Sequence, residues 1–337
     1  MDRGLGNQLE SLISSFAMAL LSNRVFLVDS TTVHHLFTPP PGLAWHYSVL
    51  PDNMNHDIIY DHSKLLDLRW NNPIEFEYLL CRDLKEAFPQ QYLFVFSDQY
   101  YLPALRHNEL YQSQLQEWFG EDIFGVLARY LMRPKEYIMQ EVSTFYDRHL
   151  SNTYSVGLQV RTATMKEHDL KALVEGMDDF AWRDWINSFW KCGMLASYRA
   201  ASASSYFIAS DHRRVKSAAD TMFGNRSHWY KQEVTRAKIS GHATALIDIL
   251  ILSTCDDIVT TTMSTFGYVP AALAAKEPLV VSYQSTCLRE ITSQPCFHKW
   301  GYLMQAKCYD KTKMISPELR MCGIYSPPEQ TPDPILD

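Results

Sequence analysis

The first residues whose types and spacing could do chemistry are Gly4, Gly6 and Asn7, in the run Gly-Leu-Gly-Asn. Glycines let the backbone take positive φ and let a ligand approach closely. A helix that begins after them would offer free N–H groups and a positive dipole end to an anion, and Asn7 would add an amide. The run therefore predicts an anion-binding turn, although a plain helix-entry turn would have the same composition.

Polar residues follow two apolar stretches later in the chain. Arg161 ends the stretch Tyr154–Arg161, and a guanidinium at a strand end could grip a diphosphate with two hydrogen bonds. The alternative for Arg161 is a surface salt bridge. Ser210 and Asp211 follow the stretch Ser205–Ala209 and could bind a ribose or a nucleobase amide. Because Ser and Asp are favoured helix N-caps, capping the next helix is their alternative role.

The segment Thr260–Tyr268 also lies between an expected strand and an expected helix. Ser264, Thr265 and the backbone near Gly267 could donate hydrogen bonds to phosphate oxygens. A run so rich in hydroxyl groups between two apolar elements favours a binding function over a purely structural one.

A general base must lie within hydrogen-bond reach of the proton that it takes. The ionisable candidates in this part of the chain are Asp211, Glu233, His242 and Asp248. Asp248 lies in an apolar helical stretch, so a buried structural carboxylate is its alternative. The neighbouring pairs Asp178-Asp179 and Asp256-Asp257 have a poor geometry for holding one metal ion between two phosphates. The sequence therefore predicts catalysis without a metal cofactor.

Helical and strand patterns alternate in two blocks. The first block has a helix at Leu9–Ser22, strands at Arg24–Asp29, Ile58–Tyr60 and Tyr92–Ser97, and helices from Leu102 to Leu150 broken near Gly120 and at Pro134. The second has strands at Tyr154–Arg161, Ser205–Ala209, Asp257–Thr261 and Pro278–Ser282, with helices at Phe180–Ser197, His212–Phe223, His242–Thr254 and Thr265–Ala274 and a short strand near His228–Tyr230. Such alternation indicates a parallel sheet covered by helices on both faces.

These blocks predict an α/β protein with two Rossmann-like domains facing a cleft. The expected domains are residues 1–151, with the start of the first domain missing, 152–284, and a Cys-rich tail, 285–337, that packs back on both. Ligands of such sheets bind beyond the carboxyl ends of the strands, where the polar residues described above are expected to lie.

Composition narrows the class of partner. The chain has 337 residues, 46% hydrophobic and 20% charged, and a net charge of −7. No block of Lys and Arg stands out, which argues against nucleic acid, and no apolar run reaches the length of a membrane span. Since a glycine turn of this kind normally follows a strand, we expect the sequence to be truncated before Gly4, with any membrane anchor lost.

Four of the seven cysteines gather near the end of the chain, and none forms a Cys-x-x-Cys pair. A structural zinc site is therefore not expected. Clustered cysteines in a loop-rich tail indicate disulfides and an oxidising compartment, with buried free thiols as the alternative. The sequon at Asn225-Arg226-Ser227 fits a secreted glycoprotein.

Taken together, these segments resemble the plant xyloglucan fucosyltransferase family, in the same order along the chain. The opening RGLGNQLESLISSFAMALLSNRVFLVD is similar to the family's first motif. FGVLARYLMRPKEYIMQEVSTFYDRHL followed by VGLQVRT resembles its helix and arginine-bearing strand, and HATALIDILILSTCDDIVTTTMSTFGYVPAALAAKEPLVV resembles its third donor motif. PCFHKWGYLMQAKC, with the later Cys322, is similar to its C-terminal disulfide region. The sequence departs from the family after Ser210, where Asp211-His212-Arg213-Arg214 replace hydroxyl-rich and aromatic residues.

The resemblance implies a GT-B-type glycosyltransferase that transfers fucose from GDP-fucose to a glycan hydroxyl, O-2 of a galactose, with inversion and no metal. It also implies a type II membrane protein of the Golgi lumen, acting in cell wall biogenesis. The alternatives are another nucleotide-sugar donor, or an inactive homologue that binds GDP or glycan. The expected donor-binding residues are Gly4, Gly6, Asn7, Arg161, Ser210, Asp211, Ser264, Thr265, Phe266 and Gly267, of which Arg161 and Asp211 are the catalytic candidates, and the expected disulfide cysteines are Cys296, Cys308 and Cys322.

Overall fold

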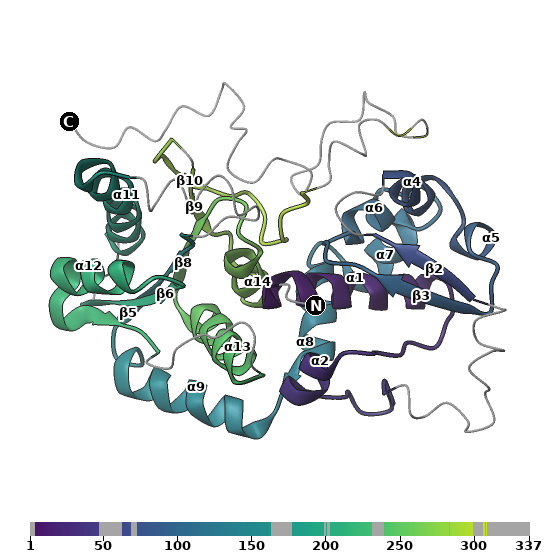
Figure 1. Cartoon of the computed structure of the whole chain (residues 1–337), viewed down its shortest axis with the longest axis horizontal. Coiled ribbons are helices and arrows are strands. Elements are labelled where there is room, and N and C mark those ends of the chain that lie inside the picture. Colours follow the sequence, from purple (N-terminus) through teal and green to yellow (C-terminus); the bar gives the residue numbers. More distant parts are fainter. Residues whose placement is uncertain are drawn as a thin grey trace.

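The structure, a computed structural model, describes residues 4–46, 63–68, 73–162, 177–198, 200, 203–230, 239–282, 284–298, 306 and 308. Helices and strands alternate through them, which confirms the expected α/β class. Figure 1 shows a half built around a sheet from the later part of the chain, beside a more helical half from the earlier part. The strand expected at Ile58–Tyr60 lies outside the described residues.

A six-stranded sheet forms the centre of the later half. Its order is β10-β9-β8-β5-β6-β7, and every pairing is parallel except that of β10 with β9. The strands are β5 (Tyr154–Val160), β6 (Ser204–Ser210), β7 (Ser227–His228), β8 (Asp257–Thr261), β9 (Leu279–Val281) and β10 (Cys287–Arg289). The strands predicted from apolar runs are thus confirmed, each within about one or two residues.

Helices cover both faces of this sheet, because successive side chains of each strand point to opposite faces. Leu158 and Ile208 belong to a buried cluster with α11 (Asp179–Ser197) and α12 (Arg213–Phe223). Phe207 belongs to the other cluster, with α13 (Ile239–Thr254) and α14 (Thr265–Leu273). Burying each large apolar side chain contributes roughly 1.5–3 kcal/mol. Packing therefore fixes the sheet from both sides.

The earlier half is organised around α1 (Leu5–Leu21). Its only described strand ladders are the parallel pair β2 (Ser63–Asp67) and β3 (Tyr92–Phe96), and the short antiparallel pair β1 (Phe37–Thr38) and β4 (Arg133–Pro134). The expected strand at Arg24–Asp29 is reduced to one bridge, from Val28 to His46. The other helices that the structure describes before α6 are α2 (Thr31–Leu36), α4 (Pro73–Cys81) and α5 (Leu84–Ala87).

The helical stretch from Leu102 to Leu150 breaks at both predicted positions, and also between Arg106 and Gln112, where the sequence predicts no break. It consists of α6 (Leu102–Arg106), α7 (Gln112–Phe119), α8 (Ile123–Leu131) and α9 (Glu136–His149). Gly120 ends α7 with φ of 64°, a conformation that costs glycine little. α9, expected as the last helix of the first domain, packs against α13 of the later half. No helix in the described part of the chain is both long and apolar enough to cross a membrane.

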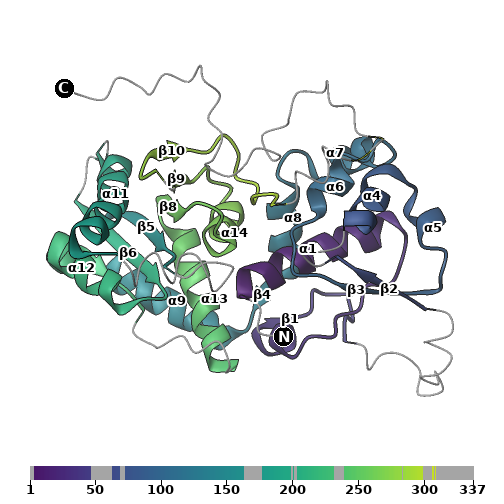
Figure 2. The ribbon, with the colours of Figure 1, turned by 45° about the horizontal axis from the view of Figure 1, so that its top comes forward.

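The two halves meet where α1 contacts α14, and Figures 1 and 2 both show α14 beside the N-terminal end of α1. One buried apolar cluster continues from α1 across this contact to Val269 and Ala272 of α14. The halves therefore share part of their core.

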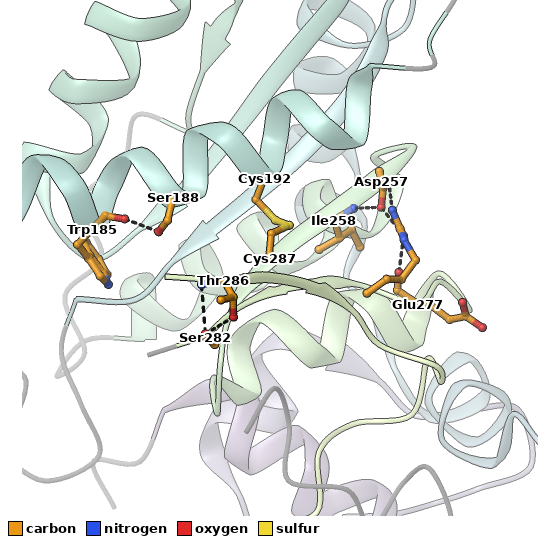
Figure 3. Close-up of a disulfide and its surroundings, with 10 residues drawn as sticks. Trp185, Ser188, Cys192, Asp257, Ile258, Glu277, Ser282, Thr286 and Cys287 are labelled. Carbon is orange, nitrogen blue, oxygen red and sulfur yellow. Dashed lines mark hydrogen bonds and ion pairs between the residues drawn. A yellow bond between two sulfur atoms is a disulfide. The ribbon is translucent and has the colours of Figure 1, made fainter. Parts of the chain in front are cut away.

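The described part of the tail is tied to both halves. Cys287 of β10 forms a disulfide with Cys192 of α11, as Figure 3 shows, and Cys308 forms one with Cys81 of α4. Cys296 is also disulfide-bonded, Cys255 is a buried free thiol, and Cys322 lies outside the described residues. The expectation of tail disulfides is confirmed, but both described bonds join the tail to the body of the protein.

Candidate functional site

Three of the predicted site segments meet at the carboxyl edge of the sheet. The register pairs Val160 of β5 with Ser210 of β6, and Gln159 of β5 with Thr260 of β8. Arg161 therefore leaves the sheet between Asp211 on one side and the turn from β8 into α14 on the other. Parallel strands end at one edge, so the order β8-β5-β6 produces this convergence.

Arg161 is held at both its backbone and its side chain. Its N–H donates to the Thr261 hydroxyl at 2.9 Å, and that hydroxyl donates to the Gln159 carbonyl at 3.1 Å. The guanidinium Nη1 lies 3.1 Å from the Asp211 carboxylate, and the Arg161 side chain stays 32% exposed. The salt bridge expected as the alternative role of Arg161 is thus present, and the side chain remains partly exposed to solvent.

Asp211 is an acceptor for the two residues that follow β5, Arg161 and Thr162. Its Oδ1 accepts from the Thr162 N–H at 3.1 Å and from the Thr162 hydroxyl at 2.9 Å, and its Oδ2 faces Arg161. The alternative role of Ser210 and Asp211, capping the next helix, is wrong. The N-cap of α12 is His212, whose Nδ1 accepts from the Arg214 N–H, while the Ser210 hydroxyl accepts from the His212 N–H.

The N-terminus of α14 opens toward this edge of the sheet. Met263 takes φ of 61°, an uncommon backbone conformation for a residue other than glycine, and it turns the chain from β8 into the helix. Ser264 is the N-cap and makes no capping bond through its side chain. The first N–H groups of a helix have no partner within it, so those of Thr265 and Phe266 can receive an anion.

Gly267 has a different role from the one predicted. Its N–H donates to the Ser264 carbonyl at 2.9 Å and is not directed at a ligand. A Cβ at Gly267 would lie 1.6 Å from the Thr260 hydroxyl and 2.8 Å from Gln159 Oε1. That hydroxyl itself donates to Gln159 Oε1 at 2.8 Å. Gly267 therefore lets α14 lie directly on a buried polar pair of the sheet.

The opening glycine run meets α14 from the other half. Gly6 and Asn7 lie inside the first turn of α1, and Gly4 is its N-cap with φ of −59°, so the expected positive-φ turn is wrong. A Cβ on Gly6 would lie 2.8 Å from the Thr265 hydroxyl and 3.0 Å from the Phe266 nitrogen. Gly6 is thus needed for close approach of two helices.

Asn7 joins the two halves through its amide. Its Oδ1 accepts from the Thr265 hydroxyl at 2.7 Å, across 258 residues of sequence, and its Nδ2 donates to the Asp98 carbonyl at 3.1 Å. The predicted residues Gly6, Asn7, Thr265 and Phe266 therefore come together at the junction between α1 and α14. An amide in the first turn of a helix was the signal available in the sequence.

Two of the four proposed bases, Asp248 and His242, lie on α13. Asp248 is buried in α13, and burial raises the pKa of its carboxyl to about 7; its electrostatic neighbours are Lys216 and Tyr230. This agrees with the structural alternative for Asp248. His242 lies near the start of the same helix, and Glu233 lies outside the described residues.

Sequence reasoning missed three polar residues in the interior. Gln159 accepts from the Thr260 hydroxyl and the Thr261 N–H, and so links β5 to β8 below the site. Thr162 anchors Asp211. Glu10 is fully buried in α1, and no residue that the structure describes donates a hydrogen bond to either of its carboxyl oxygens. Burial raises its pKa well above the usual value. A glutamine or glutamate within an apolar run of the sequence was the signal that could have indicated these buried polar residues.

A cavity of about 480 Å³ lies in the earlier half. It is lined by one side of α1, by residues 24–33 and by residues 93–98. Neither Arg161, Asp211 nor any residue of α14 lines it. Gln8, next to Asn7, is the lining residue nearest in sequence to the junction with α14.

Comparisons with known proteins agree on one family. Residues 210–304, which include Ser210, Asp211 and the start of α14, match the family model "Xyloglucan fucosyltransferase". The chain is 27% identical to "Probable fucosyltransferase 9" of Arabidopsis thaliana, over 95% of this chain and 69% of that protein. It is 26% identical to "Galactoside 2-alpha-L-fucosyltransferase" of Pisum sativum, over 95% of this chain and 65% of that protein. The chain thus spans about two thirds of the length of these relatives.

Solved structures show the same fold. An arginine-to-lysine mutant of Arabidopsis thaliana FUT1 in complex with GDP matches with a TM-score of 0.71 and 22% identity, over 88% of this chain and 74% of that one. The NodZ alpha-1,6-fucosyltransferase, soaked with GDP-fucose, matches with a TM-score of 0.55 and 15% identity, over 87% and 97%. The family model and the relatives therefore show that the chain is similar to the xyloglucan fucosyltransferase family of glycosyltransferases, and the solved structures show that it has the GT-B-type fold.

Proposed function

We propose that this chain is a fucosyltransferase that moves fucose from GDP-fucose to a hydroxyl group of a glycan, O-2 of a galactose, with inversion and without a metal ion. One observation carries the proposal. Arg161 leaves the sheet beside the turn into α14, whose first N–H groups and positive dipole end face the same edge. A guanidinium and a helix N-terminus together suit a diphosphate.

The same residues account for how the reaction would be accelerated. Breaking the bond between fucose and GDP places negative charge on the diphosphate. Arg161 and the N–H groups of Thr265 and Phe266 would stabilise that charge as it develops, which lowers the barrier more than binding the ground state does. An acceptor hydroxyl would attack the sugar from the face opposite the diphosphate, which inverts the anomeric carbon. Holding both substrates in line contributes the rest of the rate.

The sources of the donor and acceptor assignments differ. GDP and GDP-fucose are supported by the solved complexes of proteins with a similar fold, and galactose by the name of the Pisum sativum relative, a galactoside 2-alpha-L-fucosyltransferase. Disulfides Cys81–Cys308 and Cys192–Cys287 favour an oxidising compartment. We therefore propose the Golgi lumen as the place of action.

The test is transfer of labelled fucose from GDP-fucose to a panel of galactose-terminated oligosaccharides, with and without EDTA. We expect product in both conditions, with a β-linked donor giving an α-linked product by NMR. GDP-mannose and UDP-galactose, supplied in parallel, should give none. Transfer from UDP-galactose and not from GDP-fucose would contradict the proposed donor. Loss of product in EDTA would contradict the metal-free mechanism. Binding of GDP without any turnover would identify a binding protein instead.

A further inference from the structure

The pairing register places one carboxylate directly beside the arginine of the site. β5 and β6 are parallel, with Val160 opposite Ser210, so the next residues on the two strands are Arg161 and Asp211. Neighbouring strands lie about 4.8 Å apart, which brings their side chains into contact. The 3.1 Å separation of Arg161 Nη1 from Asp211 Oδ2 therefore follows from the sheet itself.

The contacts of Asp211 hold both the side chain of Arg161 and the residue that follows it. Oδ2 binds the guanidinium, whereas Oδ1 accepts from the backbone and the hydroxyl of Thr162. These three donors occupy both carboxylate oxygens of Asp211. A general base would instead direct one of its oxygens at the hydroxyl group of the acceptor. The backbone of Arg161 is fixed separately by the Thr261 hydroxyl. Asp211 thus completes a frame around the end of β5.

We propose that Asp211 is a positioning residue that holds the Arg161 guanidinium in place for the diphosphate of the nucleotide donor, and that it is not the general base. This inference rests on the proposed function. An arginine side chain loses much rotamer freedom when it binds a ligand. A partner that restrains it beforehand reduces that cost and fixes the geometry in which charge is stabilised.

The proposal has a kinetic signature, because Asp211 has two opposing effects on the donor. Its carboxylate restrains Arg161, but its negative charge also repels the diphosphate. In Asp211→Asn both effects disappear, so KM for GDP-fucose should change by no more than about threefold. The misplaced guanidinium should lower kcat by about thirtyfold, since small misplacements at a reacting centre cost up to about a hundredfold. Loss of a structural residue would instead lower the melting temperature.

The experiment is a double-mutant cycle on the full chain, with Asp211→Asn, Arg161→Lys and the double variant. Release of GDP, as fucose passes from GDP-fucose to a galactose-terminated oligosaccharide, is followed in single turnovers with enzyme in excess over GDP-fucose, so that slow variants can still be measured. Asp179→Asn is the matched control, because Asp179 pairs with Arg214 at 2.6 Å but is 83% exposed. Thermal unfolding of every variant accompanies the kinetics.

A residue that acts through Arg161 gives coupled effects. We expect Asp211→Asn to lower the rate about thirtyfold in the wild type but less than threefold in the Arg161→Lys background, with Asp179→Asn unchanged. If Asp211→Asn lowered the rate by the same factor in the wild type and in the Arg161→Lys background, or left the wild-type rate unchanged, the positioning role would be overturned. The proposed function would remain intact in both cases. A wild-type chain that neither binds GDP nor releases it from GDP-fucose would overturn both.

Discussion

The two sides of the candidate site are built in different ways. On the sheet side, Arg161 and Asp211 lie at the ends of paired strands. The Arg161 N–H donates to the Thr261 hydroxyl, and the Thr162 N–H donates to the Asp211 carboxylate. On the other side, α1 contributes Gly6 and Asn7 from a helix that packs against α14. The sheet therefore supplies charge in fixed positions, whereas the helical half supplies a close-fitting contact that holds the two halves together.

The largest expected effect breaks the sheet side. In Gly267→Ala the new Cβ would overlap the Thr260 hydroxyl, at 1.6 Å, so α14 must move off β8. We expect a loss of about 3–5 kcal/mol in unfolding free energy, measured by denaturant titration. Gly4→Ala is the matched control, because nothing lies within 4 Å of its Cβ position and its φ is −59°. Equal stability of the two variants would contradict the packing described here.

The next effect concerns how the tail is joined to the sheet. In Figure 3 the Cys192–Cys287 bond joins α11 to β10, closing a separation of 95 residues. The double variant Cys192→Ser with Cys287→Ser should lose about 2–5 kcal/mol of stability. Reversible denaturant unfolding under oxidising conditions measures this loss. Cys255→Ser should keep its disulfides and provides the comparison for serine substitution alone. An unchanged midpoint for the double variant would show that β10 is held by its pairing and not by the bond.

A third prediction uses the buried carboxyl of α13. The pKa of Asp248 is about 7 in the folded protein, against an ordinary value of 3.8. The folded state therefore binds its proton more tightly than the unfolded state, so this group lowers stability as pH rises from about 4 to 7. Asp248→Asn should remove this dependence and exceed the wild type by ~2–4 kcal/mol at pH 8.

Thermal unfolding from pH 5 to 8 measures the effect, and Asp147→Asn, an exposed change on α9, is the control. The difference between Asp248→Asn and the wild type should widen as the pH rises. If the difference in stability between Asp248→Asn and the wild type stayed constant or narrowed as the pH rose, Asp248 would already be charged in the folded state at low pH.

The smallest effect concerns the link between the halves. Thr265→Val removes the hydroxyl that donates to Asn7 Oδ1 at 2.7 Å, while the side chain keeps its shape. We expect a loss of about 1 kcal/mol, the usual net contribution of one hydrogen bond. Asn7→Ala should cost a similar amount, and the double variant should cost less than the sum. Additive losses would show that the two groups act independently.

The sequence predicted the sheet half much better than the helical half. Strands β5, β6 and β8 follow from short apolar runs, and their parallel order brings Arg161 and Asp211 to one edge. Gly6 and Asn7 were correctly selected as unusual, but their role depends on α14, whose approach is not visible in local sequence. The same limit applies to Cys308, whose partner Cys81 is 227 residues away. Long-range contacts of this kind are set by packing and leave no periodic signal.

Local rules also failed where polar residues had two possible partners. His212 caps α12, although Ser210 and Asp211 have the more favourable cap chemistry. The reason is that Asp211 is already engaged by Arg161 and Thr162 across the strand pair. Tertiary contacts thus overrode the local preference at the site itself.

The central claim is that the carboxyl edge of the sheet binds a nucleoside diphosphate through Arg161. Calorimetric titration of GDP into the wild type, Arg161→Ala and Arg214→Ala tests it most directly, since Arg214 is an arginine of the same sheet domain paired with Asp179. We predict that the wild type and Arg214→Ala bind GDP. The affinity of Arg161→Ala for GDP should be at least about a hundredfold weaker, because this variant loses a charge-assisted bidentate contact. Equal affinity for GDP in the wild type and Arg161→Ala would contradict the claim.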